Sequence, residues 1–257
     1  MKRSLIRTVF VAIAAIALWT HFTEASVPDP ITEWSIAAQQ AVAASGMAPL
    51  RTPITFAILH LAMYDAVNAV AGDREPYAVS PTVHRPASAL AAAIEAGYRI
   101  LLAEVPSQQS ALDTKYAQLR ASIPDSQEKT NGAAVGASVA QQLLTLRAND
   151  RRNLNIPYVP GSGPGVWIPT PPGFLPVTTA FLAGVTPFTM ETPWQFRPNG
   201  PPSLNSRQWA RDYDEVQKLG AKNHSLRTPE QTATALFWEP LAGTVWTATI
   251  RRMTQEQ

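Results

Sequence analysis

The segment at residues 53–70 constrains the fold of this chain more than any other part of it. It reads PITFAILHLAMYDAVNAV, a helical pattern with apolar residues on nearly every side. A helix without a polar face has to be surrounded by other helices, because its apolar side chains leave water on all sides. The segment therefore predicts a multi-helix core with this helix at the centre.

Four polar residues interrupt this apolar helix. His60, Tyr64 and Asn68 are spaced four apart, so they share one stripe of the helix, and Asp65 lies well round from His60. One interpretation is a proton-handling or ligand site inside the bundle. The other is a seam of hydrogen-bonded groups that fixes helix register, which we favour because buried polar groups usually find partners. We expect Asp65 to orient a loop or cap by accepting backbone amides.

Further helical patterns surround this segment and predict an all-α fold. They cover residues 31–45, 88–104, 107–122 and 124–149, and the short links between them favour antiparallel neighbours in a bundle. We expect Thr52 to cap the apolar helix and Pro53 to lie in its first turn. We assign residues 26–149 to this N-terminal helical bundle. Small residues in the last segment predict one close-packed face, formed by Gly132, Gly136, Ser138 and Ala140.

The composition changes abruptly at Asp150. Residues 156–202 hold 12 of the 23 prolines and 6 of the 13 glycines, which predicts an extended and irregular chain. A disordered linker would be poor in aromatic residues, yet this stretch is rich in them. We therefore interpret residues 150–204 as a long ordered arm that wraps the bundle and is held by aromatic anchors. These aromatic residues are Tyr158, Trp167, Phe174, Phe181, Phe188, Trp194 and Phe196.

Helical patterns return in residues 205–257. We expect one helix over 205–218 capped by Ser206 or Asn205, and another that starts at Thr228 and Pro229 and runs to Trp238. A last pattern covers residues 244–253. The chain then reaches its final residue with no glycine and no capping residue, so we expect this region to be the truncated start of a second helical region.

The first 25 residues have the pattern of a secretory signal peptide. Lys2, Arg3 and Arg7 precede a short apolar run, and a small-x-small site predicts cleavage after Ala25. The run is shorter than the roughly 20 residues that span a bilayer, so we expect no stable membrane span after cleavage. An uncleaved N-terminal anchor is the alternative. We expect a secreted or periplasmic protein, and because it has no cysteine, packing or a bound ligand has to stabilise it.

The charge distribution argues against nucleic-acid binding. The first 25 residues hold three of the 21 basic side chains and one of the 19 acidic ones, so the remaining chain has 18 of each. No dense patch of lysine and arginine follows, since Arg151-Arg152 and Arg251-Arg252 are isolated pairs. Phosphate binding depends on such patches, so we expect no nucleic-acid partner.

The familiar catalytic motifs are missing from the sequence. His21, His60, His84 and His224 share no metal-ligand spacing such as H-x-x-x-H, and no cysteine accompanies them. The sequence also lacks a G-x-S-x-G elbow, a dinucleotide fingerprint and a phosphate loop. The glycine-rich run at 161–165 has no lysine and no following helix, so we interpret it as a turn in the arm.

Two groups of charged residues are better explained by structure than by chemistry. Arg197-Pro198 lies beside Trp194 and Phe196, and an arginine held in this way can bind an oxyanion. We expect it instead to bond a carbonyl or carboxylate of the arm. A solvated, salt-bridged helix face is expected from Arg207, Arg211, Asp212, Asp214 and Glu215. No catalytic, cofactor-binding or metal-binding residue is predicted in this chain.

Several blocks taken together resemble a known family. They are LHLAMYDAVNAV at residues 59–70 with Pro76-Tyr77, YVPGSGPGVWIPTPP at 158–172, VTPF at 185–188, QFRP at 195–198 and LFW at 236–238. In this order they resemble the vanadium-dependent haloperoxidase-like proteins of the type 2 phosphatidic acid phosphatase superfamily. The resemblance implies an all-α fold, a bound vanadate, and oxidation of halide by hydrogen peroxide. Hydrolysis of phosphate esters is the alternative activity within the same superfamily.

The residues that bind vanadate in that family have no counterpart here. The family uses a lysine separated by six residues from Arg-Pro, a Pro-Ser-Gly-His and a Ser-Arg with a later histidine. Position 190, where that lysine would stand before Arg197-Pro198, is Met190. We therefore expect an N-terminal half that binds no vanadate, is inactive alone, and either forms a homo-oligomer or associates through exposed apolar surface. A non-catalytic helical scaffold or interaction module is the alternative.

Overall fold

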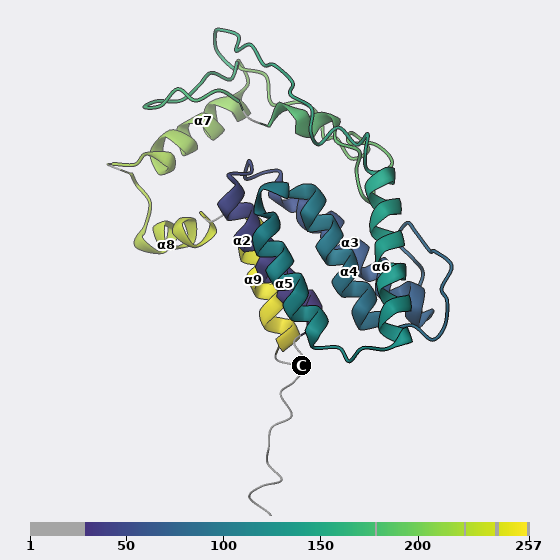
Figure 1. The fold of residues 1–257 in the computed structure, drawn as a ribbon. Helices are drawn as coiled ribbons and strands as arrows, with labels where there is room; N and C mark the ends of the chain where they lie inside the picture. The colour runs from purple at the N-terminus through teal and green to yellow at the C-terminus, as the bar shows by residue number, and fades with distance from the viewer. Residues whose placement is uncertain (1–28, 178, 224, 240–241, 256–257) are drawn as a thin grey trace, which may run out of the picture.

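The computed structural model describes residues 29–177, 179–223, 225–239 and 242–255, and this part of the chain is all-α, as predicted (Figure 1). The predicted signal peptide at 1–25 lies outside the described residues. The helices are α2 (Pro30–Ser45), α3 (Thr52–Ala71), α4 (Ala89–Glu104), α5 (Gln109–Ala121), α6 (Gln127–Leu146), α7 (Arg207–Gly220), α8 (Pro229–Trp238) and α9 (Ala242–Gln255), with short 3₁₀ helices at Pro106–Gln108 and Ala180–Gly184.

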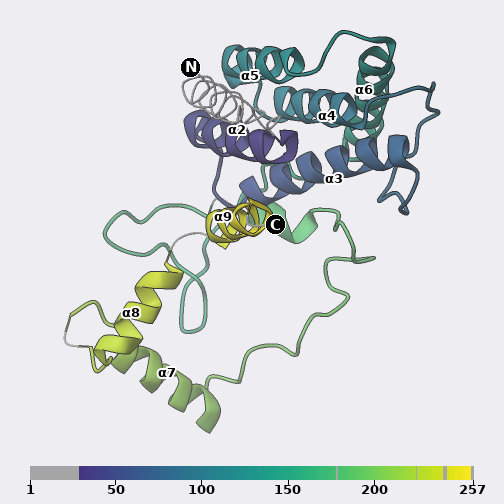
Figure 2. The same cartoon turned by 90° about the horizontal axis from the view of Figure 1, so that it is seen from below.

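Helices α2 to α6 form the bundle predicted for the N-terminal region. Helix α4 packs against α2, α3, α5 and α6, whereas α3 packs against α2, α4 and α6 (Figures 1 and 2). The helix at the centre is therefore α4, which corrects the expectation for α3. The core between them is apolar and continuous. Its largest fully buried side chains include Trp34, Ile58, Leu59, Met63, Ile94, Ile100, Leu101, Leu112 and Leu143.

Helix α3 has the length and apolar composition of a membrane span. The bundle already buries 56% of its apolar window. The helices α2, α4 and α6 pack against it, whereas the side that carries Tyr64 is exposed. Burial in the core therefore accounts for the composition of α3.

Glycines on α6 let it approach α4 closely. A Cβ atom added at Gly132 would lie 2.2 Å from the carbonyl oxygen of Ser88, and one at Gly136 would lie 2.2 Å from that of Ala92. Ala140, one turn further along, is fully buried. The predicted close-packed face is confirmed for these three positions. Ser138 lies off this face and accepts a hydrogen bond from Gln142 of its own helix.

Helix starts follow the predicted capping chemistry with one exception. Ser206 caps α7 through the backbone N–H of Trp209, and Thr228 forms a reciprocal capping box with Gln231 at the start of α8. Thr52, by contrast, is the first residue of α3 itself, and no side chain caps that helix. The prediction for Thr52 was wrong because Arg51 already has helical backbone angles, so the cap position falls one residue earlier.

The arm is held to the bundle in its middle rather than along its length. Phe181 is buried and Phe188 packs against the core. The other five aromatic residues of the arm are exposed by 43% or more, so the prediction that they anchor it was wrong. They are Tyr158, Trp167, Phe174, Trp194 and Phe196.

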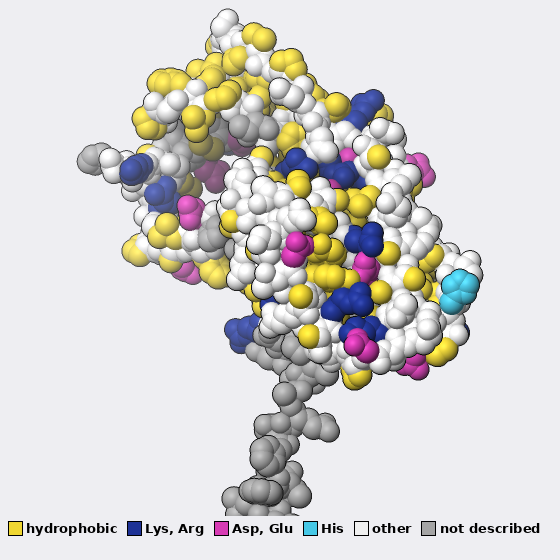
Figure 3. Space-filling model, in the orientation of Figure 1, with side chains coloured by type: hydrophobic (Ala, Val, Ile, Leu, Met, Phe, Trp, Pro, Cys, Tyr) yellow, Lys and Arg dark blue, Asp and Glu magenta, His cyan; other side chains and the backbone are white. Residues whose placement is uncertain are grey.

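Helices α7 and α8 lie away from the bundle and bury none of their residues (Figure 2). Apolar side chains of these two helices therefore stay on the surface, and those of the arm gather over the upper part of the molecule (Figure 3). The largest exposed ones after residue 204 are Tyr213, Val216, Leu226, Leu236, Phe237, Trp238, Trp246, Ile250 and Met253.

Candidate functional site

Asp65 holds the loop that follows α3. Its side chain is fully buried, and Oδ1 accepts a hydrogen bond from the backbone N–H of Tyr77 at 2.6 Å. Oδ2 accepts from the N–H groups of Ala78 at 3.1 Å and Val79 at 3.0 Å. Three amide donors satisfy a buried carboxylate that would otherwise be costly. The predicted role of Asp65 is therefore confirmed.

The polar stripe of α3 binds the same loop. Asn68 donates to the carbonyl oxygen of Arg74 at 2.6 Å and accepts from its N–H at 2.9 Å. The hydroxyl of Tyr64 donates to the carbonyl oxygen of Glu75 at 2.7 Å. Tyr64 and Asn68 are thus structural, but their partners are loop carbonyls and amides rather than another helix, which corrects the idea that they fix helix register.

The histidines do not come together in the part of the chain that is described. His60 is half-buried beside the Phe56 ring, with 6.3 Å between ring centroids, and burial lowers its pKa. His84 is exposed. His21 and His224 lie outside the described residues. The searched residues contain no group of three or more His, Asp or Glu side chains that could hold a metal ion.

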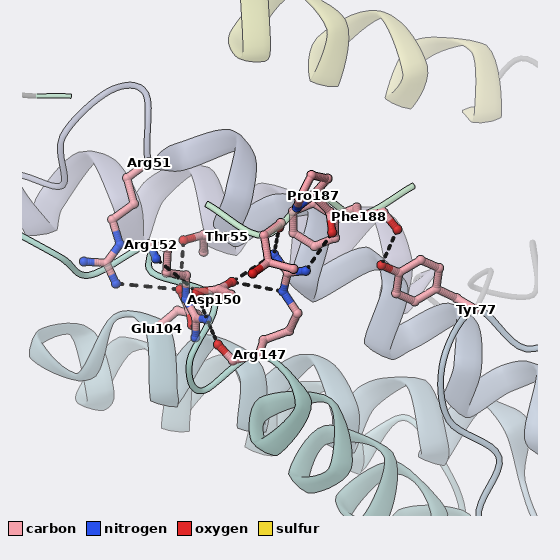
Figure 4. A network of polar contacts seen from close by, with 10 residues as sticks. Arg51, Thr55, Tyr77, Glu104, Arg147, Asp150, Arg152, Pro187 and Phe188 are labelled. Carbon is pink, nitrogen blue, oxygen red and sulfur yellow. Dashed lines mark hydrogen bonds and ion pairs between the residues drawn. The ribbon is translucent and has the colours of Figure 1, made fainter. Parts of the chain in front are cut away.

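A buried ionic cluster lies where α6 ends, and the sequence did not predict it (Figure 4). Arg147 donates through Nε to Oδ2 of Asp150 at 2.9 Å. Nη1 of Arg152 lies 2.9 Å from the other oxygen of Asp150, and its Nη2 donates to Oε1 of Glu104 at 2.8 Å. All four residues are at most 7% exposed. Such pairs are strong only when the charges are matched and hydrogen-bonded, and each carboxylate here faces at least one arginine.

Thr55 of α3 and Arg51, the residue just before that helix, complete the cluster. Thr55 is fully buried and donates its hydroxyl to Oε2 of Glu104 at 3.1 Å. Nη2 of Arg51 lies 3.8 Å from the same oxygen. Burial lowers the pKa of Arg152, but the carboxylates of Glu104 and Asp150 outweigh that effect and raise it above its ordinary value. The cluster therefore links α3, α4 and the start of the arm.

The cluster also fixes the middle of the arm. Arg147 donates to the carbonyl oxygens of Thr186 at 2.7 Å and Pro187 at 3.1 Å. Its guanidinium lies over the Phe188 ring, 4.0 Å from the centroid. The hydroxyl of Tyr77 donates to the carbonyl oxygen of Phe188 at 2.8 Å (Figure 4). The loop after α3 and the end of α6 thus meet at residues 186–188.

A cavity of about 410 Å³ opens beside this cluster. Arg51, Glu104 and Arg152 are its ionisable lining residues, and no histidine lines it. The other lining residues are Ser45, Met47, Ala48, Val105, Pro106, Ser107, Asn153, Leu154, Asn155 and Phe181.

The charged residues singled out in the second half of the sequence stay on the surface. The side chain of Arg197 is exposed and has no carbonyl or carboxylate partner in the described part of the chain, so its predicted bond is absent. The predicted charged face of α7 is solvated. Of its residues, only Asp214 forms an ion pair among the described residues, with Lys218 at 2.6 Å.

Sequence reasoning missed the ionic cluster because its partners are distant in the chain. Glu104 and Arg152 are 48 positions apart. Arg147, Asp150 and Arg152 do stand close together in the sequence, but Arg151-Arg152 was read as an isolated basic pair. An acidic residue between arginines just after a helix was the one available signal.

The described residues do not fit a bound vanadate. A bound vanadate needs a histidine beside its cationic donors, and no histidine lines the cavity next to the ionic cluster. Comparisons of the chain with protein-family models, curated proteins and solved structures found no match.

Proposed function

We propose that this chain is the non-catalytic helical part of a secreted haloperoxidase-like protein. In this proposal it holds an arm in place, and another part of the parent protein binds vanadate and oxidises halide with hydrogen peroxide. The observation that carries the proposal is where the blocks of the sequence resemblance lie in the folded chain.

Two of those blocks meet in one network. Asp65 and Tyr77 belong to the block at 59–77, where Asp65 binds the N–H of Tyr77, and Tyr77 in turn binds the carbonyl oxygen of Phe188 in the block at 185–188. Arg147 binds the carbonyl oxygens of Thr186 and Pro187 in that second block. Residues far apart in the sequence thus share one structural task. Their joint presence supports a common origin with the family better than any single block does.

The remaining blocks are on the surface. Trp167 in the glycine-rich block, Phe196 beside Arg197, and Phe237 and Trp238 on α8 are all 43% exposed or more. Large apolar patches of this kind mark sites that another body covers. We propose that the occupant is the anion-binding helical part of the same parent protein.

An activity assay tests the proposed inactivity of this chain. The purified chain is incubated with vanadate, hydrogen peroxide and bromide, and bromination of a dye is followed. We expect no turnover above that of vanadate alone. Turnover above that control would contradict the proposal. Hydrolysis of p-nitrophenyl phosphate, measured in parallel, tests the phosphatase alternative in the same way.

The DNA that follows the codon of Gln257 tests the parentage. We expect one forward reading frame to encode Pro-Ser-Gly-His and a lysine separated by six residues from Arg-Pro. If neither motif is found in any frame, the enzyme assignment is contradicted, and the alternative of a helical scaffold or interaction module is left.

A further inference from the structure

The cavity beside the ionic cluster has the properties of a ligand site that is separate from any vanadate chemistry. We propose that it binds a small organic carboxylate, with Arg51 as the residue that receives the negative charge. The proposal depends on the free donors of the cavity, on its charge and on its apolar lining.

Arg51 has unused hydrogen-bonding capacity. A guanidinium carries five N–H donors in a planar fork, which suits bidentate binding of a carboxylate. Within the described residues, Arg51 has one ionic contact, the 3.8 Å approach of Nη2 to Glu104. Its side chain is 28% exposed and makes no hydrogen bond to the described residues, so its Nη donors are free to bind an acceptor in the cavity.

Arg152 contributes a second positive charge to the same wall. Its side chain is 7% exposed, and its Nη1 and Nη2 are bonded to Arg147 and Glu104. Arg51 and Arg152 therefore bring positive charge to one space from two different elements.

The charge of the cluster favours an anion. Three arginines, Arg51, Arg147 and Arg152, surround two carboxylates, Glu104 and Asp150. One positive charge is left over, that of Arg51, whose side chain is 28% exposed and lines the cavity. A monovalent anion near Arg51 would neutralise this excess without displacing either carboxylate.

The size and lining of the cavity favour an organic anion over an inorganic one. A volume of about 410 Å³ exceeds what a single oxyanion fills and lies in the range of small-molecule pockets. Much of the lining is apolar, with Met47, Val105, Leu154 and Phe181. A compact apolar body with one carboxylate matches both features.

Binding of 4-fluorobenzoate to the full chain, followed by ¹⁹F NMR, tests the proposal. We expect a dissociation constant of about 1 mM or tighter. The neutral analogue 4-fluorobenzamide has the same shape without the charge, so we expect it to bind at least about tenfold more weakly. Inorganic phosphate should compete poorly because it lacks the apolar body.

Two variants locate the site. Arg51→Gln should weaken 4-fluorobenzoate binding at least about tenfold, whereas Arg74→Gln, which removes an exposed arginine of the loop after α3, should leave it unchanged. Ala48→Phe fills the cavity and keeps its charge, so it should also weaken binding. Circular dichroism checks that each variant is folded.

Three results would each overturn the proposal. They are no binding of 4-fluorobenzoate at about 10 mM, equal binding of the amide, and unchanged binding in a folded Arg51→Gln or Ala48→Phe variant. The first two need no variant, so the test does not depend on how the substitutions fold.

Discussion

The bundle formed by α2 to α6 and the region of α7 and α8 are both helical, yet they differ in what they bury. Helices α3 and α4 bury most of their residues, whereas none of the described residues of α7 or α8 is buried. On α7, Trp209 and Tyr213 stack on each other at 5.0 Å between centroids, with Tyr213 56% exposed. Caps and amphipathic spacing are thus enough to define a helix, but a core needs a second apolar face opposite the first.

Truncating a leucine side chain should give the largest difference in stability loss between the bundle and the region of α7 and α8. Leu143→Ala on α6 removes a fully buried side chain and should lower the free energy of unfolding by about 3 to 4 kcal/mol. Leu236→Ala on α8 removes the same atoms from a side chain that is 66% exposed. This variant should change the free energy of unfolding by less than about 0.5 kcal/mol. Urea unfolding measures both. Equal losses would contradict the difference in burial.

The loop after α3 offers a second contrast. Asp65→Asn places an amide donor against backbone N–H groups and removes the charge that binds three of them, so we expect a loss of about 2 to 3 kcal/mol. Asp73→Asn changes an aspartate of the same loop that is 67% exposed, and should be neutral. Thermal unfolding followed by circular dichroism compares the two variants. An Asp65→Asn variant with unchanged stability would show that the loop needs no charged acceptor.

Replacing glycine by alanine should change stability in opposite directions in the two regions. Alanine favours a helix over glycine by about 1 kcal/mol, so Gly220→Ala on α7, with its nearest contact at 3.6 Å, should be neutral or stabilising. Gly136→Ala on α6 would put a Cβ atom 2.2 Å from the carbonyl oxygen of Ala92, and should destabilise by about 2 kcal/mol. The midpoints of urea denaturation show whether each variant is stabilised or destabilised. A stabilised Gly136→Ala variant would contradict the close approach of α4 and α6.

The smallest effect concerns the pH dependence of the bundle. Burial lowers the pKa of His60 below its ordinary value of 6.5, so the unfolded chain binds the proton more readily. The stabilising effect of a neutral His60 is complete above pH 6.5 and is lost as the pH falls below it. His60→Gln should therefore reduce the drop in melting temperature between pH 7 and pH 5, whereas His84→Gln at an exposed position should not. An unchanged drop in His60→Gln would show that His60 has no part in it.

The sequence predicted those features that depend on neighbours along the chain. The apolar helix α3, the caps Ser206 and Thr228, the glycine face of α6 and the role of Asp65 all follow from local patterns. The ionic cluster could not be predicted in the same way, because Glu104 meets Arg152 only after α4 and α6 have packed. The prediction that aromatic residues anchor the arm was wrong for a related reason, since aromatic content indicates burial only when a partner surface is present.

Hydrogen exchange along the whole chain tests the central difference most directly. In a monomeric sample, we predict that the amides in the middle of α4 and α6 exchange at least about a thousandfold more slowly than those of α7 and α8, because only the bundle has a core that must open first. Equal protection of α7 and α8 would contradict this account, since it would mean that those helices are held by buried packing as the bundle is.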